Sequence, residues 1–358
     1  MNFTLFGYPK TGKTTLFNLL TGAQIEVKSY DQGKREPNAR TCPVPDQRLD
    51  QLSQLFPDKQ KIPAQIDYID LAGVSYGEIK NESYLDYLRK ADGLTHVVRN
   101  FQNIQVPHHG EKVEALADIK SIEEEILLAD LISVENRLEK LDKELEKTKS
   151  SEGKKEKEIL EHIKQSLEDG VPVRHLDLKT TEEIFIRNFA FLSQKPLIHM
   201  INVDEKEVEL IEKPEKIYSP DKKNTCVLAF CGKIESEILE LESKDRKAFM
   251  EEYGLKELST SRFLRSSYEL MDVITFFTVG KNEVKSWTIQ RDSTALTAAG
   301  KIHSDIEKGF IRAEVISWDL LLNHGSFQEA RKSGDLRLEG KEYLVQDGDV
   351  LYFRFSKS

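Results

Sequence analysis

Five short apolar runs, rich in β-branched and aromatic residues, recur along the chain up to Phe230. They are residues 2–6 (NFTLF), 66–70 (IDYID), 94–98 (LTHVV), 197–201 (LIHMI) and 226–230 (CVLAF). Each run ends at a polar or glycine-containing loop, and helical patterns lie between them, which predicts β-α-β units around a doubly wound, mostly parallel sheet. Ligands of such sheets bind at the carboxyl ends of the strands, and the motifs described below all fall there.

A long helical pattern interrupts this rhythm between LTHVV and LIHMI. Its first apolar series alternates spacings of three and four, as in a coiled-coil seam, and consists of Leu131, Val134, Leu138, Leu141 and Leu145. A second series, Ile159, Ile163 and Leu167, recurs every four residues until Gly170 and Pro172 end the helix. The polar residues 148–158 (TKSSEGKKEKE) separate the two series, so we predict an antiparallel helical hairpin with a solvated tip.

From about residue 272 the pattern changes to paired strands. ITFFTVGKNEVKSWTI predicts a hairpin that turns at residues 280–282, and KEYLVQDGDVLYFRF predicts a second pair around residues 347–349. The helix-like stretch TALTAAGKIHSDIEKG lies between them. We therefore expect a small, separate α+β module at the end of the chain.

Composition narrows the class of protein. A chain of 358 residues suits two or three domains, and it has neither a signal-peptide pattern nor an apolar run long enough to span a membrane. The chain has three cysteines, Cys42, Cys226 and Cys231, which is an odd number, and their spacing is not that of metal ligands. Both features favour reduced thiols in a cytoplasmic protein. A formal net charge of -10 argues against a general nucleic-acid binder, so we expect no DNA partner, and any RNA partner must bind a local patch.

The C-terminal module is the part of the chain best suited to such a patch. Residues 272–358 hold 12 Lys and Arg against 13 Asp and Glu, so the module is nearly neutral. Candidates for an RNA-facing patch are Lys301, His303, Lys308 and Arg312. A histidine such as His303 is more often a packing or capping residue than a ligand, and Trp287 and Trp318 fit the core better than a stacking platform. The charge of the helical hairpin is explained by a solvated helix face.

The first loop has the spacing G-x-x-x-x-G-K-[ST] of a phosphate-binding loop, between a predicted strand and a predicted helix. Its predicted nucleotide-binding residues are Gly7, Tyr8, Pro9, Lys10, Thr11, Gly12, Lys13, Thr14 and Thr15. Gly7 and Gly12 allow the backbone N–H groups to face phosphates, and the helix adds its positive end. Lys13 is placed to reach the β and γ phosphates, and Thr14 to bind Mg²⁺.

Three further loops complete a candidate nucleotide site. Asp70 ends the strand IDYID and could hold Mg²⁺, and the Gly73 amide could meet the γ phosphate. At the end of LIHMIN, Asn202, Val203 and Glu205 stand where guanine-specific proteins carry N-K-x-D, so guanine selectivity should be weak. Cys231 and Gly232 follow CVLAF, where a loop beside the base usually lies. Ordinary strand-ending loops are the alternative explanation of these three pieces.

Several stretches of the chain resemble the YchF subfamily of Obg-like translation-factor NTPases. They are NARTCPVPDQRLDQL, HVVRNF, INVDE, TFFTVGKNEVKSWTI, AAGKIHSDIEKGFIRAEVIS and LRLEGKEYLVQDGDV. The resemblance implies an α/β P-loop G domain at residues 1–113 and 193–271, a helical coiled-coil insertion at 114–192, and a TGS module of β-grasp type at 272–358. It also implies a preference for ATP over GTP, slow Mg²⁺-dependent hydrolysis, and a ribosomal or ribosomal-RNA partner bound through the TGS module and the insertion.

Departures from this family cluster where the γ phosphate should lie. Lys10 replaces an asparagine, Lys34 stands where the family has a threonine, and YGEIKNESYLDYL replaces a glycine-rich switch. Val74 falls where classical GTPases keep a water-orienting glutamine, and the subfamily is likewise apolar there. We consider two roles for Lys10: a catalytic one beside Lys13, in which its ammonium supplies transition-state charge, or a solvent-facing one that raises affinity for a polyanion.

Two functions fit these residues. The first is a nucleotide-hydrolysing switch with Mg²⁺ held by Thr14 and Asp70 and ATP or GTP as substrate; the second is a binding module without turnover. A P-loop kinase fits less well, because the sequence shows no arginine-rich lid segment.

Overall fold

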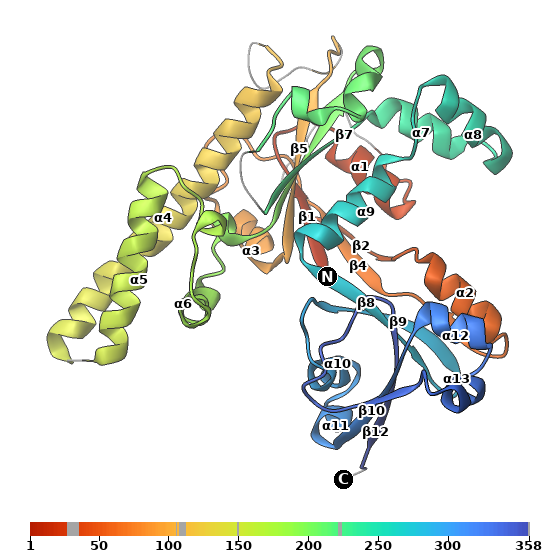
Figure 1. The fold of residues 1–358 in the computed structure, drawn as a ribbon. Helices are drawn as coiled ribbons and strands as arrows, with labels where there is room; N and C mark the ends of the chain where they lie inside the picture. The colour runs from red at the N-terminus through yellow and green to blue at the C-terminus, as the bar shows by residue number, and fades with distance from the viewer. Residues whose placement is uncertain (27–35, 105, 107–111, 149, 221–223, 357–358) are drawn as a thin grey trace. The chain divides into compact units, whose positions relative to one another are not determined.

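The computed structural model describes residues 1–26, 36–104, 106, 112–148, 150–220 and 224–356, which fold into two compact units. One unit contains Met1–Thr41 and Asp67–Ser267, and the other contains Cys42–Ile66 and Tyr268–Ser358 (Figure 1). No helix within these described ranges combines the length and the apolar character needed to cross a membrane.

A six-stranded sheet forms the centre of the first unit, in the order β2-β4-β1-β5-β6-β7. Its strands are β1 (Asn2–Phe6), β2 (Asn38–Pro43), β4 (Gln65–Asp70), β5 (Gly93–Asn100), β6 (Leu197–Val203) and β7 (Thr225–Phe230). Neighbours from β4 through β7 pair in parallel, so their carboxyl ends share one edge. All five apolar runs predicted as strands are strands, and the predicted α/β fold class is confirmed.

Helices connect these strands, and some of them cover the sheet. They are α1 (Lys13–Thr21), α3 (Glu82–Lys90), α4 (Ala115–Lys147), α5 (Ser151–Glu168), α6 (Thr180–Ile186), α7 (Gly232–Glu240), α8 (Ser243–Glu252) and α9 (Ser259–Leu270). Short 3-10 segments fill the connections at Val173–His175, Arg187–Phe189, Leu192–Gln194, Glu205–Ile211 and Pro214–Lys216, and the longest, Glu205–Ile211, is kinked at Glu207.

The first half of α4 lies along one face of the sheet. Ile119 belongs to an apolar cluster with Val98, and Ile126 to a neighbouring cluster with Leu94. Leu94 and Val98 are four residues apart on β5 and therefore point to the same face. Helix α4 is thus part of the core beside the strands as well as the start of the helical hairpin.

The second half of α4 pairs with α5 as the predicted hairpin, and the two helices run side by side in yellow in Figure 1. Val134 and Leu141 of α4 are buried against Leu160 and Ile163 of α5. The solvated tip predicted at residues 148–158 is too long, because α5 already begins at Ser151. The Ser150 hydroxyl caps α5 by accepting from the Gly153 N–H at 3.1 Å. This N-cap bond stabilises the start of a helix in a polar stretch that has no apolar periodicity.

The second unit contains another six-stranded sheet, in the order β11-β10-β12-β8-β9-β3. Its strands are β3 (Gln60–Ile62), β8 (Val273–Val279), β9 (Glu283–Gln290), β10 (Phe310–Ser317), β11 (Arg337–Glu339) and β12 (Asp349–Phe355). Its helices are α2 (Gln47–Leu55), α10 (Ala295–Ile302), α11 (Ser304–Lys308), α12 (Trp318–His324) and α13 (Phe327–Ser333). The first predicted hairpin is confirmed, since β8 and β9 pair antiparallel.

The second predicted hairpin, around residues 347–349, is wrong. Strand β12 pairs with β10 antiparallel and with β8 in parallel, and the residues before it form an irregular loop. Hydrogen bonds hold this loop: the Asp347 Oδ1 atom accepts from the Thr275 N–H at 2.9 Å, and the Asp349 Oδ2 atom accepts from the Gln346 N–H at 2.9 Å. Asp347 thus ties the loop to β8, and the buried Asp349 accepts from a donor within the loop itself.

Residues 42–66 belong to this second unit, although the sequence placed them with residues 1–113. Strand β3 pairs in parallel with β9, Lys61 opposite Val284. Leu49 and Leu52 of α2 are buried in a cluster with Phe277 of β8. These contacts join segments far apart in the sequence, and local patterns carry no information about them.

Candidate nucleotide-binding site

The loop between β1 and α1 has a backbone that two of its glycines make possible. Gly7 has a φ of 135° and Gly12 a φ of 101°, both in the region that side chains disfavour. A Cβ atom on Gly7 would lie 2.8 Å from the Val97 carbonyl oxygen, and one on Gly12 would collide with the Asn202 amide. Both glycines predicted from the motif are therefore required by the packing of the loop.

Lys13 and Thr14 occupy the first turn of α1, beside the end of β4. The Lys13 side chain is buried, and its Nζ donates to the carbonyl oxygens of Gly7 at 3.2 Å and Tyr8 at 2.6 Å. The Thr14 hydroxyl donates to Asp70 Oδ2 at 2.9 Å. The structure thus brings the predicted phosphate lysine and the two predicted Mg²⁺ ligands together.

Asn38 also contacts Asp70, which the sequence did not predict. Its Nδ2 donates to Asp70 Oδ2 at 3.2 Å. The residue begins the NARTCPVPDQRLDQL stretch named in the family resemblance, but no local pattern indicates a contact with Asp70. Lys34, four residues earlier, lies outside the described residues.

A cavity of about 610 Å³ opens beside the loop. Of the predicted residues, Lys10, Gly12, Thr15, Asn202, Val203, Glu205, Cys231 and Gly232 line it. Its wall also contains residues that were not predicted: Asn18, Phe101, Gln102, Asn103, Val106, Asp204, Lys233 and Ser236. Residues 101–103 directly follow β5, which lies between β1 and β6 in the sheet. Their position at the carboxyl end of a central strand is the sequence signal that could have identified them as cavity residues.

Two of the side chains that line the cavity, Asn202 and Glu205, have partners in the neighbouring loops. The Asn202 Nδ2 donates to the Thr11 carbonyl at 3.1 Å, and its Oδ1 accepts from the Gly232 N–H at 3.0 Å. Asn202 therefore ties the phosphate loop to the loop after β7. Glu205 forms an exposed ion pair with Lys233 at 2.6 Å.

A buried arginine supports the wall formed by residues 101–103. Arg99 donates through Nε to the Phe101 carbonyl at 3.1 Å, and its guanidinium lies 4.6 Å from the centre of the Phe101 ring. Burial lowers the pKa of Arg99, opposed by the nearby Asp118 carboxylate. Arg99 thus fixes the backbone that presents Phe101 to the cavity.

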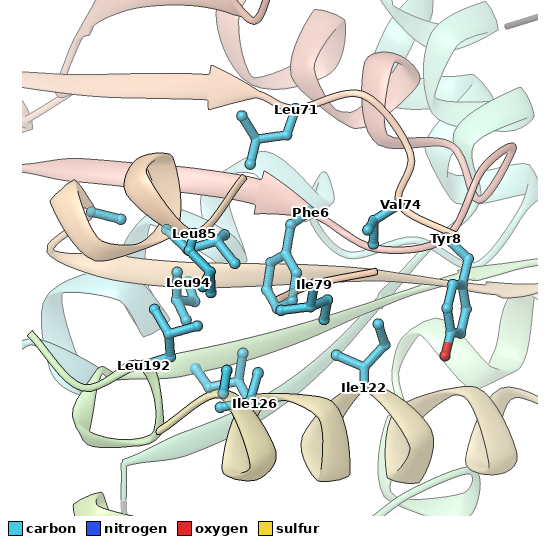
Figure 2. Packing of buried hydrophobic residues seen from close by; sticks show 14 residues of the cluster. Phe6, Tyr8, Leu71, Val74, Ile79, Leu85, Leu94, Ile122, Ile126 and Leu192 are labelled. Carbon is cyan, nitrogen blue, oxygen red and sulfur yellow. The ribbon is translucent and has the colours of Figure 1, made fainter. Parts of the chain in front are cut away.

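Three other predicted residues, Tyr8, Pro9 and Gly73, pack against neighbouring segments and do not line the cavity. Tyr8 is 1% exposed and lies in an apolar cluster with Val74, its ring turned toward the helix that carries Ile122 (Figure 2). A Cβ atom on Gly73 would lie 2.5 Å from the Pro9 Cα atom. The segment after Asp70 therefore packs directly on the phosphate loop, and a buried Val74 cannot orient a water molecule.

A chain of buried polar side chains begins next to Gly7. The Nδ1 atoms of His96 and His199 lie 3.1 Å apart, and His199 Nε2 lies 3.3 Å from Glu123. Burial lowers the pKa of both histidines, well below the usual range for His96. The contact with Glu123 is therefore a hydrogen bond from a neutral imidazole, although its distance would also suit an ion pair.

The four candidates for an RNA patch in the second unit do not gather on one face. Lys301 and Lys308 lie on α10 and α11, which pack on the sheet face that includes Ala313. Arg312 neighbours Ala313 on β10 and points to the opposite face. His303 caps α11 by accepting from the Asp305 N–H at 3.1 Å, as its capping interpretation predicted.

Comparisons with known proteins agree with these features. A family model described as "50S ribosome-binding GTPase" matches residues 2–165, and the YchF GTPase C-terminal family, described as "Protein of unknown function (DUF933)", matches residues 273–356. The chain is 37% identical to a Bacillus subtilis (strain 168) protein and 38% identical to one of Escherichia coli O157:H7, both named ribosome-binding ATPase YchF. Each match covers 98% of both chains.

A solved structure extends the similarity to the fold. The Schizosaccharomyces pombe YchF GTPase superposes with a TM-score of 0.84 at 25% identity, over 99% of this chain and 97% of that one. The resemblance inferred from the sequence is thereby confirmed. The chain belongs to the YchF family of Obg-like P-loop NTPases.

Proposed function

We propose that this protein is a Mg²⁺-dependent purine-nucleotide NTPase that acts as a ribosome-associated switch. The observation that carries the proposal is the contact between the Thr14 hydroxyl and the Asp70 carboxylate, 2.9 Å apart and next to Lys13. Hydroxyl and carboxylate oxygens are hard ligands that suit Mg²⁺, which when bound would neutralise charge on the nucleotide phosphates. Thr14 and Asp70 would hold it.

Lys13 would exchange its present partners for phosphate. Its Nζ is bonded to two carbonyl oxygens of the loop, at Gly7 and Tyr8, so the ammonium is already held inside the loop. A phosphate oxygen can replace these neutral acceptors with a charge-assisted bond. Lys13 would bind the β and γ phosphates and stabilise charge that develops during transfer.

The base end of the cavity supports a preference for ATP. Asn202 is engaged by two backbone groups, and the Glu205 carboxylate is paired with Lys233. A carboxylate neutralised in this way is a poor acceptor for the two donor groups of guanine. Binding of ATP and GTP measured side by side tests this, and a preference for GTP would contradict it.

Hydrolysis would be slow without a partner. Val74 is buried and cannot position water, so the water-orienting group has to come from elsewhere. Single-turnover phosphate release, with and without ribosomes, tests the proposal against a Lys13→Ala background. Release above that background supports a hydrolase.

The same burial of Val74 favours a second candidate, a nucleotide-binding module without turnover. It predicts tight ATP binding with phosphate release no faster than in Lys13→Ala, ribosomes present or absent. The two candidates therefore separate in one assay.

We propose ribosome association from the names of the relatives. The C-terminal module and the helical hairpin would make the contact with the ribosome, and the protein would act in the cytoplasm. Sedimentation with purified ribosomes, with ATP and without nucleotide, tests it. A switch requires that the bound fraction differ between the two conditions.

A further inference from the structure

Glu125 is a carboxylate of α4 that contacts two backbone groups of the segment after Asp70. Its Oε1 accepts from the Gly77 N–H at 2.9 Å, and its Oε2 accepts from the Ile79 N–H at 3.2 Å. Gly77 has a φ of 77°, and Ile79 is fully buried, so the segment turns sharply at this point. Both carboxylate oxygens are therefore needed to satisfy one turn.

The same carboxylate reaches the phosphate loop through Tyr8. The Tyr8 hydroxyl donates to Glu125 Oε1 at 3.4 Å and lies 2.8 Å from the Ser121 hydroxyl. Burial, together with the Glu125 charge, raises the pKa of Tyr8 to about 12, so the phenol stays a neutral donor. Figure 2 shows the Tyr8 oxygen directed at α4, away from the packed side chains of Val74 and Ile79.

These contacts join three elements at one side chain. Tyr8 belongs to the phosphate loop, Gly77 and Ile79 belong to the segment that follows Asp70, and Glu125 and Ser121 belong to α4. The Val74 N–H, which donates to the Gly7 carbonyl at 3.2 Å, is a second link between the first two elements. The γ phosphate of a bound nucleotide would lie where these two elements meet.

We infer that Glu125 is a positioning residue that holds the segment after Asp70 against the phosphate loop and couples both to α4. The inference rests on the proposed nucleotide site and goes beyond it, because it assigns a role to the base of the helical hairpin. Glu125 does not touch the cavity, so it acts through Gly77, Ile79 and Tyr8. Loss of the carboxylate should therefore impair turnover without weakening nucleotide binding.

The test compares Glu125→Gln with Glu124→Gln, a matched change of the exposed neighbour on the same helix. Hydrogen exchange of residues 74–81 is measured first, in the nucleotide-free protein. The two N–H groups bond to different oxygens of Glu125, and a glutamine replaces one of these oxygens with an NH2 donor, so exchange at Gly77 or Ile79 should be about tenfold faster in Glu125→Gln. It should be unchanged in Glu124→Gln.

Tyr8→Phe keeps the buried ring and removes only the hydroxyl, so it tests the link to the phosphate loop even if Glu125→Gln folds poorly. We expect a smaller rise in exchange over residues 74–81. Binding and turnover follow: the ATP Kd of Glu125→Gln should stay within about twofold of wild type while the single-turnover rate falls about tenfold.

Equal exchange in Glu125→Gln and Glu124→Gln would overturn the inference. So would faster exchange with an unchanged single-turnover rate, because the carboxylate would then have only a structural role. If the wild type releases no phosphate, the proposed hydrolysis fails by itself. The exchange at Gly77 and Ile79 in the nucleotide-free protein still decides whether Glu125 holds this segment.

Discussion

At the scale of single residues, Lys10 combines an unfavourable backbone with a place at the nucleotide cavity. Its φ is 63°, a region that Asn adopts more readily than Lys, and its side chain lines the cavity. Lys10→Asn should therefore raise the free energy of unfolding of the nucleotide-free protein by about 0.5–1 kcal/mol, measured by urea unfolding.

The same variant tests the proposed charge of Lys10. If its ammonium replaces a bound cation, turnover of the wild type should be alike in K⁺ and Na⁺, and Lys10→Asn should lose about tenfold in Na⁺ and recover in K⁺. An unchanged rate and cation dependence would leave Lys10 as a surface charge that raises affinity for phosphates.

His96 and His199 predict that the first unit becomes less stable in mild acid. Burial lowers the pKa of both, so the folded state keeps them neutral, whereas an unfolded histidine takes up a proton below a pH of about 6.5. Their contribution to stability is complete above that pH and declines as the pH falls toward their folded values, by at most about 1.4 kcal/mol per pH unit for each histidine.

His199→Gln should remove part of this slope. Urea unfolding from a pH of about 7.5 to about 5.5 compares it with His162→Gln, an exposed histidine on α5 that solvent surrounds in both states. The charged and titratable groups near the pair are Lys13, Glu123, Arg174 and Tyr218. Equal slopes in the two variants would mean that these neighbours set the pH dependence.

At the scale of elements, the helical hairpin depends on a narrow apolar seam. Leu160 of α5 is fully buried against Val134 and Leu141 of α4. Leu160→Ala should destabilise the paired helices by about 2–4 kcal/mol, seen as faster hydrogen exchange in α4 and α5. Leu128→Ala, at a position 50% exposed, should change exchange little. Similar effects of both changes would mean that the seam does not hold the hairpin.

Elements were predictable wherever a periodic pattern or a motif lay within one stretch of chain. Five of the six strands of the first sheet, the hairpin helices and the phosphate loop are of this kind. Strand β3, with only three residues, has no period to detect, and its partner β9 is distant in sequence. Asn38, Phe101 and Glu125 were missed for the same reason, because their roles depend on which strands and helices the fold brings together.

At the scale of the whole molecule, the nucleotide should stabilise one unit more than the other. All residues that line the cavity belong to the unit of Met1–Thr41 and Asp67–Ser267. A ligand that binds only the folded state adds RT ln(1 + [L]/Kd), about 2.7 kcal/mol at 100 times Kd. Mg²⁺-ATP should therefore raise the midpoint of the thermal transition of this unit and leave that of the second unit unchanged.

Removal of the metal distinguishes direct binding of the ATP phosphates by the protein from binding through the predicted Mg²⁺ site. Because Thr14 and Asp70 would bind ATP through the ion, EDTA should remove much of the stabilisation, and Asp70→Asn should remove the difference between ATP with and without Mg²⁺. Lys13→Ala should weaken the binding of ATP both with and without Mg²⁺. Scanning calorimetry resolves the thermal transitions of the two units. If ATP shifted the midpoints of both units equally, and did so with or without EDTA, it would be acting as a general polyanion.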